Sequence, residues 1–353
     1  MKALVLSGGA GTRLRPITHT SAKQLVPIAN KPILFYGLES IRDAGIADVG
    51  IIVGDTHAEI EAAVGNGEAW GLNVTYIRQD APLGLAHAVL TAEEFVRGDD
   101  FVMYLGDNVI KGGIAGLVEE FRREAPAAMI LLARVPEPQR FGVAELEGDR
   151  VVRLIEKPDV PPSDLALVGV YMFGPSILEA AKSIRPSARG ELEITDAIQA
   201  LIDAGEHVRP HIIDGWWKDT GRLEDLLEAN RIMLSDLVPH IEGSVDKTSE
   251  IAGAVEICEG AEIVRSSIRG PVIIGARTRV TDSFIGPYTA ISEECTIEDS
   301  EIEHSVIWAG STIVGMHRLE DSLIGREVVV DRTERKPKAY RMMLGDHSRV
   351  DVV

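Results

Sequence analysis

The stretch KALVLSGGAGTRLRPIT, residues 2–18, decides how the first half of this chain folds. Its apolar beginning predicts a strand, and the glycines that follow predict a bare turn whose backbone N–H groups phosphate oxygens can approach. The turn lacks the Gly-Lys-Ser/Thr ending of a P-loop, and Leu14 stands where a dinucleotide fingerprint needs its third glycine. The cations that would offset the charge of a triphosphate are Arg13, Arg15 and Lys23.

Short apolar runs alternate with amphipathic segments up to residue 237. This alternation predicts a Rossmann-like α/β domain, with a mostly parallel sheet covered by helices on both faces. Ligands of such sheets bind at the carboxyl ends of the strands, where the glycine turn and the turn Gly106-Asp107-Asn108 fall. We expect strands at residues 2–6, 49–53, 74–78, 101–105 and 129–134, and helices at residues 32–43, 57–64, 85–95 and 114–123.

The composition is that of a globular protein of 353 residues, long enough for two domains of about 150 residues each. The net charge of -19 argues against nucleic acid as a partner, because DNA binding needs a concentrated basic face. No apolar run approaches the ~20 residues that span a bilayer, so we expect no membrane partner. The chain has only two cysteines, Cys258 and Cys295, and begins without a signal peptide. These features predict a cytoplasmic location.

A different period begins at Ile251, from which apolar residues recur at intervals of five or six positions. Three consecutive intervals sum to 17 residues, as in the series 251, 268, 285, 302 and 319. Neither a helix nor an ordinary strand has this spacing. A triangular coil of three short strands does, since each strand contributes one inward side chain that stacks on the next coil. The pattern resembles the hexapeptide-repeat left-handed parallel β-helix. Its expected inward residues are Ile251, Ile257, Ile263, Ile268, Ile274, Val280, Ile285, Ile291, Ile297, Ile302, Ile307, Ile313, Leu319, Ile324 and Val330.

The two patterns divide the chain into expected domains. We predict a Rossmann-like α/β domain over residues 1–238, a polar linker over residues 239–250 and a left-handed β-helix over residues 251–331. Residues 332–353 form a tail that we expect to cap the open end of the solenoid, because terminal coils usually need a cap. A solenoid of flat parallel strands offers rigid faces for subunit contact, so we expect a homo-oligomer.

Three further residues suit the chemistry of phosphate. Asp107 and Asp219 each lie in a turn and could serve as two hard oxygen ligands for Mg²⁺ beside a triphosphate. Lys157, in the segment Ile-Glu-Lys-Pro, could hold a second phosphate, with Glu156 accepting hydrogen bonds from sugar hydroxyls. An alternative for each residue is an ordinary exposed turn or strand end.

Taken together, these motifs resemble the sugar-1-phosphate nucleotidyltransferase family over residues 1–238, in its long-form thymidylyltransferase branch. The signature G-x-G-x-R-L-x-P-x-T-x4-K-x3-P begins at Gly9, and the run RGELEITD at residues 189–196 is highly specific to the family. The resemblance implies dTTP and glucose 1-phosphate as substrates and Mg²⁺ as the cofactor. Phe141 stands where family members often carry tyrosine, which leaves the preferred sugar open.

The resemblance also implies a set of site residues. Catalytic roles fall on Arg13, Lys23, Asp107, Lys157 and Asp219, the metal ligands being Asp107 and Asp219. Nucleotide-binding roles fall on Leu6, Gly8, Gly9, Gly11, Thr12, Arg13, Gln79, Pro82, Gly84 and Asp107. Sugar-phosphate-binding roles fall on Phe141, Gly142, Glu156, Lys157, Gly169, Tyr171, Arg189 and Glu191.

The implied reaction is an in-line attack of the sugar phosphate on the α-phosphorus of the nucleotide, which releases pyrophosphate without a covalent enzyme intermediate. Three alternatives stay open. Gln79 does not see the C5 methyl group, so a UTP-using uridylyltransferase is one. The β-helix could add an acyltransferase activity, with His304 or His317 as its base. The first domain could also be a sensor that binds sugar nucleotides without turnover.

Overall fold

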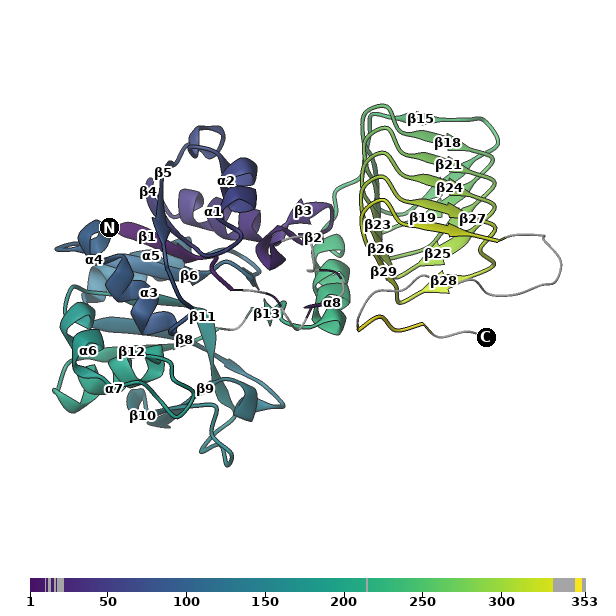
Figure 1. Cartoon of the computed structure of the whole chain (residues 1–353). Helices are drawn as coiled ribbons and strands as arrows, with labels where there is room; N and C mark the ends of the chain where they lie inside the picture. The colour runs from purple at the N-terminus through teal and green to yellow at the C-terminus, as the bar shows by residue number, and fades with distance from the viewer. Residues whose placement is uncertain are drawn as a thin grey trace. The chain divides into compact units, whose positions relative to one another are not determined.

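A computed structural model describes residues 1–9, 11, 14–15, 17, 22–213, 215–332 and 347–350 (Figure 1). The chain divides into two compact units. The first comprises Met1–Ala10, Ser21–Leu25 and Ile33–Asp219, and the second comprises Gly11–Thr20, Val26–Pro32 and Thr220–Val353. Two predicted site residues, Thr12 and Arg13, lie outside the described residues, as does most of the predicted tail.

The first unit is built on a nine-stranded sheet whose main path runs β10-β9-β11-β6-β1-β4-β5, with β8 pairing β11 and β12. The pairs among β6, β1, β4 and β5 are parallel, as predicted, and so is the pair β12–β8. Antiparallel pairs join β11 to β6, β8 and β9, and β9 to β10. The strands are β1 (Lys2–Leu6), β4 (Asp48–Val53), β5 (Asn73–Arg78), β6 (Phe101–Leu105), β8 (Ala128–Arg134), β9 (Gly142–Glu147), β10 (Arg150–Glu156), β11 (Leu165–Phe173) and β12 (Val208–Ile212).

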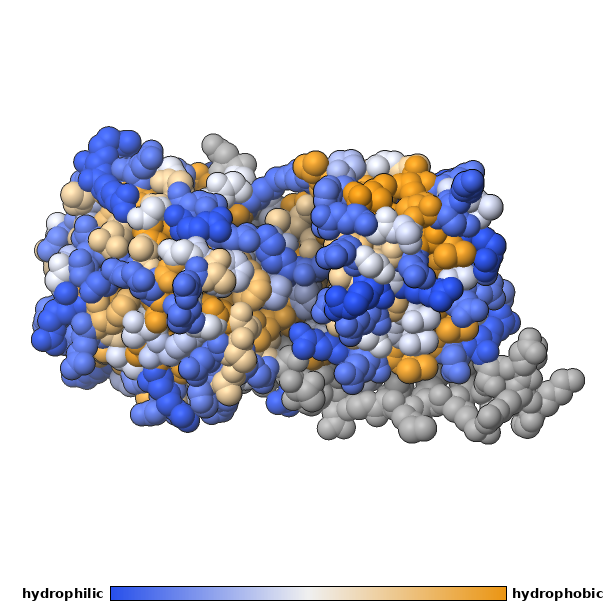
Figure 2. Space-filling model, turned by 90° about the horizontal axis from the view of Figure 1, so that it is seen from above, coloured by the Kyte–Doolittle hydropathy of each residue, from blue (hydrophilic) through white to orange (hydrophobic). Residues whose placement is uncertain are grey.

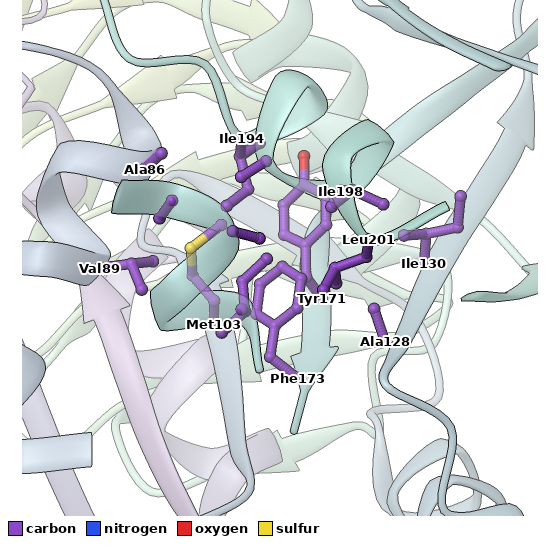
Figure 3. Close-up of a cluster of buried hydrophobic side chains, with 14 of the residues drawn as sticks. Ala86, Val89, Met103, Ala128, Ile130, Tyr171, Phe173, Ile194, Ile198 and Leu201 are labelled. Atoms are coloured by element: carbon purple, nitrogen blue, oxygen red, sulfur yellow. The ribbon is translucent and has the colours of Figure 1, made fainter. Parts of the chain in front are cut away.

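Helices cover both faces of this sheet, because alternate residues of each strand point to opposite faces. Leu4 and Leu6 of β1 belong to a core with α3, α4, α6 and α7, part of which Figure 3 shows. Ala3 and Val5 belong to a second core with α1, α2 and α5. The helices are α1 (Ile33–Asp43), α2 (His57–Val64), α3 (Leu85–Thr91), α4 (Glu93–Val96), α5 (Ala115–Glu124), α6 (Ile177–Ser183) and α7 (Ile194–Asp203).

The second unit contains a parallel β-helix of three sheets. One sheet stacks β14 (His240–Ile241), β17 (Val255–Ile257), β20 (Val272–Ile274), β23 (Thr289–Ile291), β26 (Val306–Ile307) and β29 (Leu323–Ile324). The next stacks β15 (Ser244–Val245), β18 (Glu262–Val264), β21 (Arg279–Thr281), β24 (Thr296–Glu298), β27 (Thr312–Val314) and β30 (Val329–Asp331). The third stacks β16 (Glu250–Ala252), β19 (Ser267–Arg269), β22 (Phe284–Ile285), β25 (Glu301–Glu303) and β28 (Leu319–Glu320).

The predicted inward ladder is confirmed. Ile251 pairs with Ile268, and the same ladder continues through Ile285 and Ile302 to Leu319. The predicted inward residues form the core of the β-helix, fully buried in the middle coils and partly buried at its two ends. Strands β14 and β15 pair with β17 and β18, so the ladder extends into residues 239–250, which the sequence suggested as a linker.

A short hairpin and one helix pack on this solenoid within the second unit. The hairpin consists of β2 (Pro27–Ile28) and β3 (Lys31–Pro32), and the helix is α8 (Leu223–Leu234). Asn30, in the left-handed region at φ 58°, donates from Nδ2 to the carbonyl of Ile291 at 2.7 Å. Buried Asn230 of α8 accepts from the Ala29 N–H at 2.9 Å and donates to the Tyr288 carbonyl at 3.0 Å. The Asn230 side chain thus joins α8 to the β2–β3 hairpin and to the β-helix.

Replacing Asn230 by alanine should lower the free energy of unfolding by about 2 kcal/mol, because it leaves a partly buried N–H and a partly buried carbonyl without this partner. Urea denaturation measures the loss. The matched control is Asn73→Ala, since Asn73 is exposed and its side-chain amide donates to Asp48 at 3.0 Å. We expect this control to change stability by less than about 0.5 kcal/mol. Equal losses in the two variants would contradict the bridging role of Asn230.

The surface is that of a strongly charged protein. Figure 2 shows hydrophilic residues over most of the visible face, with hydrophobic residues in small groups between them. Among the described residues, no helix has both the length and the hydropathy needed to cross a membrane.

Candidate functional site

The site lies at the carboxyl ends of the parallel strands of the first unit. After β1 the chain continues into Ser7, whose N–H donates to the Ile52 carbonyl at 2.8 Å, and then into Gly8 and Gly9. After β6, the N–H of Gly106 donates to the Leu6 carbonyl at 2.9 Å. These bonds hold the glycine turn beside the turn that carries Asp107. Gly11 has a backbone φ of 61°, a left-handed conformation that favours glycine.

Lys23 and Asp107 meet at this edge. Lys23 lies in the 3-10 helix Lys23–Leu25, and its ammonium group forms an ion pair with the Asp107 carboxylate. A β-carbon on Gly9 would lie 3.7 Å from Lys23 Cε, so Lys23 also borders the glycine turn. Burial alone would raise the pKa of Asp107, but the Lys23 charge and hydrogen bonds from Lys23 and Asn108 outweigh it and lower the pKa. Asp107 is therefore held as a carboxylate.

Asp219 lies beside Asp107 although the two residues are far apart in sequence. Strand β13 (Trp217–Asp219) pairs antiparallel with β7 (Asn108–Ile110), and the register places Asp219 opposite Asn108. Asp107 directly precedes that partner in the chain. Within the described ranges, no group of three or more His, Cys, Asp or Glu side chains is placed to hold a metal ion. The register thus places Asp219 diagonally across the two strands from Asp107.

Asn108 connects the two halves of the site. Its buried amide donates from Nδ2 to Asp107 Oδ1 at 3.1 Å, and its Oδ1 accepts from Trp217 Nε1 at 2.6 Å. The rings of Trp217 and Phe141 lie 5.5 Å apart in an edge-to-face arrangement. A β-carbon on Gly169 would lie only 2.7 Å from the Asn108 amide, so β11 requires glycine at this point. A continuous set of contacts therefore runs from Asp107 to Phe141.

Glu156 and Lys157 lie at the other end of this set of contacts. Glu156 pairs with Gly142 between β10 and β9, and a β-carbon on Gly142 would lie 3.2 Å from Glu156 Oε2. Lys157 adopts φ 41°, and its N–H donates to the Phe141 carbonyl at 3.0 Å. Its ammonium group lies 3.1 Å from Glu156 Oε1. The left-handed backbone of a non-glycine residue marks a constrained position.

Arg189 gathers acidic side chains next to Glu156. Its guanidinium donates to Glu156 at 3.2 Å, to Glu191 at 3.0 Å and to Glu193 at 3.3 Å. Burial raises the pKa of Glu193, which also accepts from the Ser187 hydroxyl at 2.8 Å. Burial, and then the charge of Glu156, raise the pKa of Tyr171, so its phenol stays neutral. Figure 3 shows the Tyr171 ring among the core side chains.

Gln79, Pro82 and Gly84 form the loop between β5 and α3. The N–H of Gln79 donates to the Val53 carbonyl at 2.9 Å, which continues the sheet to the edge of the site. Pro82 is exposed. Gly84 has φ 106°, and a β-carbon there would lie 2.4 Å from the Leu192 carbonyl oxygen, so only glycine fits.

Replacing Gly84 by alanine should lower the free energy of unfolding by about 3 kcal/mol, because backbone strain and a clash with backbone atoms add together. The control is Gly148→Ala, at φ 65° with no atom within 4 Å of the new β-carbon. It should lose only about 1 kcal/mol, the strain alone. Urea denaturation compares the two variants, and equal losses would show that the clash has no effect.

The sequence analysis missed several residues of this site. Local sequence patterns assign no role to Asn108 or Trp217, yet their side chains join the two halves. Gln24 and Ser7 are buried with side-chain oxygens that have no hydrogen-bond partner within the described part of the chain. Both border Gly106, where a β-carbon would lie 2.8 Å from Ser7 Oγ. Gln24 could have been found by its position next to Lys23.

Comparison with known proteins adds an independent observation. The family model for nucleotidyl transferases matches residues 2–236. This range contains every site residue described above.

Two full-length relatives are named as enzymes that transfer a nucleotidyl group. The glucose-1-phosphate thymidylyltransferase of Streptomyces griseus is 58% identical over 353 residues, which cover 100% of this chain and 99% of the relative. The low-salt glycan biosynthesis nucleotidyltransferase Agl11 of Haloferax volcanii is 44% identical over 355 residues and 99% of each chain. A crystal structure of a Bacillus anthracis chain assigned as a glucose-1-phosphate thymidylyltransferase, in complex with a sucrose, is similar at a TM-score of 0.63 and 35% identity. It covers 68% of this chain and 98% of that one.

Proposed function

Because the chain belongs to the nucleotidyl transferase family, in its glucose-1-phosphate thymidylyltransferase branch, we propose that it transfers a thymidylyl group from dTTP to glucose 1-phosphate. The products are dTDP-glucose and pyrophosphate. The observation that carries this proposal is the register of β13 on β7, which sets Asp219 opposite Asn108 and so beside Asp107. Lys23 forms an ion pair with Asp107 and borders the glycine turn, as a triphosphate site requires.

The reaction needs two anions to approach each other. A phosphate oxygen of glucose 1-phosphate forms a bond to the α-phosphorus of dTTP while the bond to the β-phosphate breaks, and pyrophosphate leaves with the electron pair. The sugar phosphate is already ionised, so no protein nucleophile is needed and the residues act by positioning and charge neutralisation. We assign Lys157 to the sugar phosphate, and Lys23 with Arg13 to the triphosphate.

The remaining residues surround these charges. Glu156 is assigned to the sugar hydroxyls, since Arg189 and Lys157 hold its carboxylate at the end of β10. Phe141, Gly142, Gly169, Tyr171 and Glu191 would shape the sugar pocket. Gln79, Pro82 and Gly84 would face the base, and Leu6, Gly8, Gly9, Gly11 and Thr12 the nucleotide phosphates and sugar.

Magnesium fits the carboxylate pair. Mg²⁺ usually takes one or two carboxylates and completes its shell with phosphate oxygens and water, and Asp107 already holds a cationic group, the Lys23 ammonium. Asp107 and Asp219 are the residues that would hold the ion. When bound, it would offset negative charge on the α-phosphate.

A cytoplasmic location and a homo-oligomer belong to the same proposal. Both cysteines, Cys258 and Cys295, are free, as suits a reducing compartment. The flat faces of the β-helix suit symmetric subunit contact. Light scattering of the purified protein measures the mass, and a monomer of 38.2 kDa would contradict the oligomer.

Pyrophosphate release tests the activity. The purified protein is given glucose 1-phosphate with dTTP, UTP, CTP, ATP or GTP in turn. We expect the strongest release with dTTP, as the family branch implies, and some release with UTP because Gln79 does not sense the C5 methyl group. Turnover with UTP alone would favour the uridylyltransferase alternative. Binding of dTTP without any release would favour the sensor alternative.

A further inference from the structure

The orientation of the Gln79 side-chain amide is fixed by its neighbours. Gln79 Nε2 lies 3.4 Å from the Gly84 carbonyl oxygen. A backbone carbonyl can only accept a hydrogen bond, so the amide nitrogen and not the amide oxygen must face it. The Gly84 carbonyl thereby identifies the end of the Gln79 amide that faces it as the nitrogen.

His87 binds the same nitrogen. Its Nδ1 lies 2.9 Å from Gln79 Nε2. Because Nε2 is a donor, Nδ1 must accept, which requires a neutral imidazole with its proton on Nε2. His87 lies on α3 between Ala86 and Val89, which Figure 3 places in the hydrophobic core. His87 itself is half-buried and belongs to neither core.

The amide oxygen of Gln79 is left to face the glycine turn. A β-carbon on Gly8 would lie 3.5 Å from Gln79 Oε1, so this oxygen points to the turn that follows β1. An acceptor in this place can pair with the imide N3–H of thymine or uracil. The N3 of cytosine is itself an acceptor, so the two groups would repel each other. Turning the amide over would bring its oxygen against the Gly84 carbonyl, which is also an acceptor.

We propose that His87 is a positioning residue that holds the Gln79 carbonyl oxygen toward the base, so that the site accepts imide-bearing pyrimidines and rejects cytosine. This inference rests on the proposed function, in which Gln79 reads the base. The Gly84 carbonyl sets which end of the amide faces it, and the shorter bond from Gln79 to His87 holds the side chain in that place.

The test compares kcat/KM for dTTP with kcat/KM for dCTP, with glucose 1-phosphate saturating. His87→Ala should lower the dTTP-to-dCTP ratio by about tenfold, the effect of losing one orienting hydrogen bond. His87→Asn offers an acceptor oxygen near the same place and should keep the ratio within about threefold of the wild type. The matched control is His207→Ala, because His207 is exposed in the loop before β12. Circular dichroism confirms that each variant is folded.

Gln79→Ala separates this inference from the proposed function. If Gln79→Ala lowers the ratio and His87→Ala does not, base reading stands and the role of His87 is overturned. If Gln79→Ala leaves the ratio unchanged while dTTP is still used, both base reading and the His87 role are overturned and thymidylyl transfer stands. If both variants lower the ratio and His87→Asn restores it, the inference is supported.

Discussion

Asp107→Asn is expected to lower kcat by about 10²- to 10³-fold while the protein stays folded. The substitution keeps the shape of the side chain and removes the negative charge that pairs with Lys23 and that we assign to magnesium. Losing one preorganised charge contact in an enclosed site typically costs this much. Pyrophosphate release with saturating dTTP and glucose 1-phosphate measures kcat.

The control for this variant is Asp149→Asn. Asp149 is exposed in the turn between β9 and β10, at the end of that hairpin opposite the pair of Gly142 and Glu156. It should retain wild-type turnover. Thermal denaturation of both variants separates a loss of catalysis from a loss of fold, which matters because Asp107→Asn removes the ion pair between Lys23 and residue 107. Wild-type turnover in folded Asp107→Asn would refute the role of the carboxylate pair.

Lys157→Gln is expected to lower kcat/KM for glucose 1-phosphate by about 10²-fold, mostly by raising its KM, with little change in the KM for dTTP. Lys157 is held at φ 41° by the bond from its N–H to the Phe141 carbonyl, so its position does not depend on its charge. The variant should therefore fold normally and lose only the cation that binds the sugar phosphate. Initial rates with each substrate varied in turn give the two KM values.

Lys182→Gln is the matched control for Lys157. Lys182 lies on α6 and forms ion pairs with Glu93 and Glu179 at 3.0 and 2.8 Å. Such surface pairs contribute about 0–1 kcal/mol, so this variant should keep wild-type kinetics. An equal rise in both KM values for Lys157→Gln would show a general disturbance of the site and not a sugar-phosphate contact.

The sequence predicted best those parts of the fold that a local pattern encodes. The ladder from Ile251 to Leu319 could be counted directly, because stacking in a solenoid repeats one inward residue per strand. The strand Phe101–Leu105 and the helix His57–Val64 match their predicted bounds. The predicted helix 85–95 is divided into α3 and α4 at Ala92, next to Thr91, whose hydroxyl donates to the His87 carbonyl.

Long-range pairing could not be predicted in the same way. Strand β11 is buried along its whole length, so its sequence is apolar without alternation and does not indicate the antiparallel direction of its neighbours. The contact of Asn108 with Trp217 depends on the pairing of β7 with β13, which no local pattern reveals. The roles of Asp107, Asp219 and Lys157 stay predictions, whereas their neighbours are now known from the structure.

The most direct test of the central claim is the fate of oxygen in glucose 1-phosphate labelled with ¹⁸O at the three non-bridging phosphate positions. Direct attack on the α-phosphorus predicts that dTDP-glucose keeps all three labelled oxygens, one of them in the bridge between the two phosphorus atoms. ³¹P NMR detects this bridge by its isotope shift on both phosphorus atoms. Label in the released pyrophosphate, or an unlabelled bridge in the product, would contradict a single displacement by the sugar phosphate.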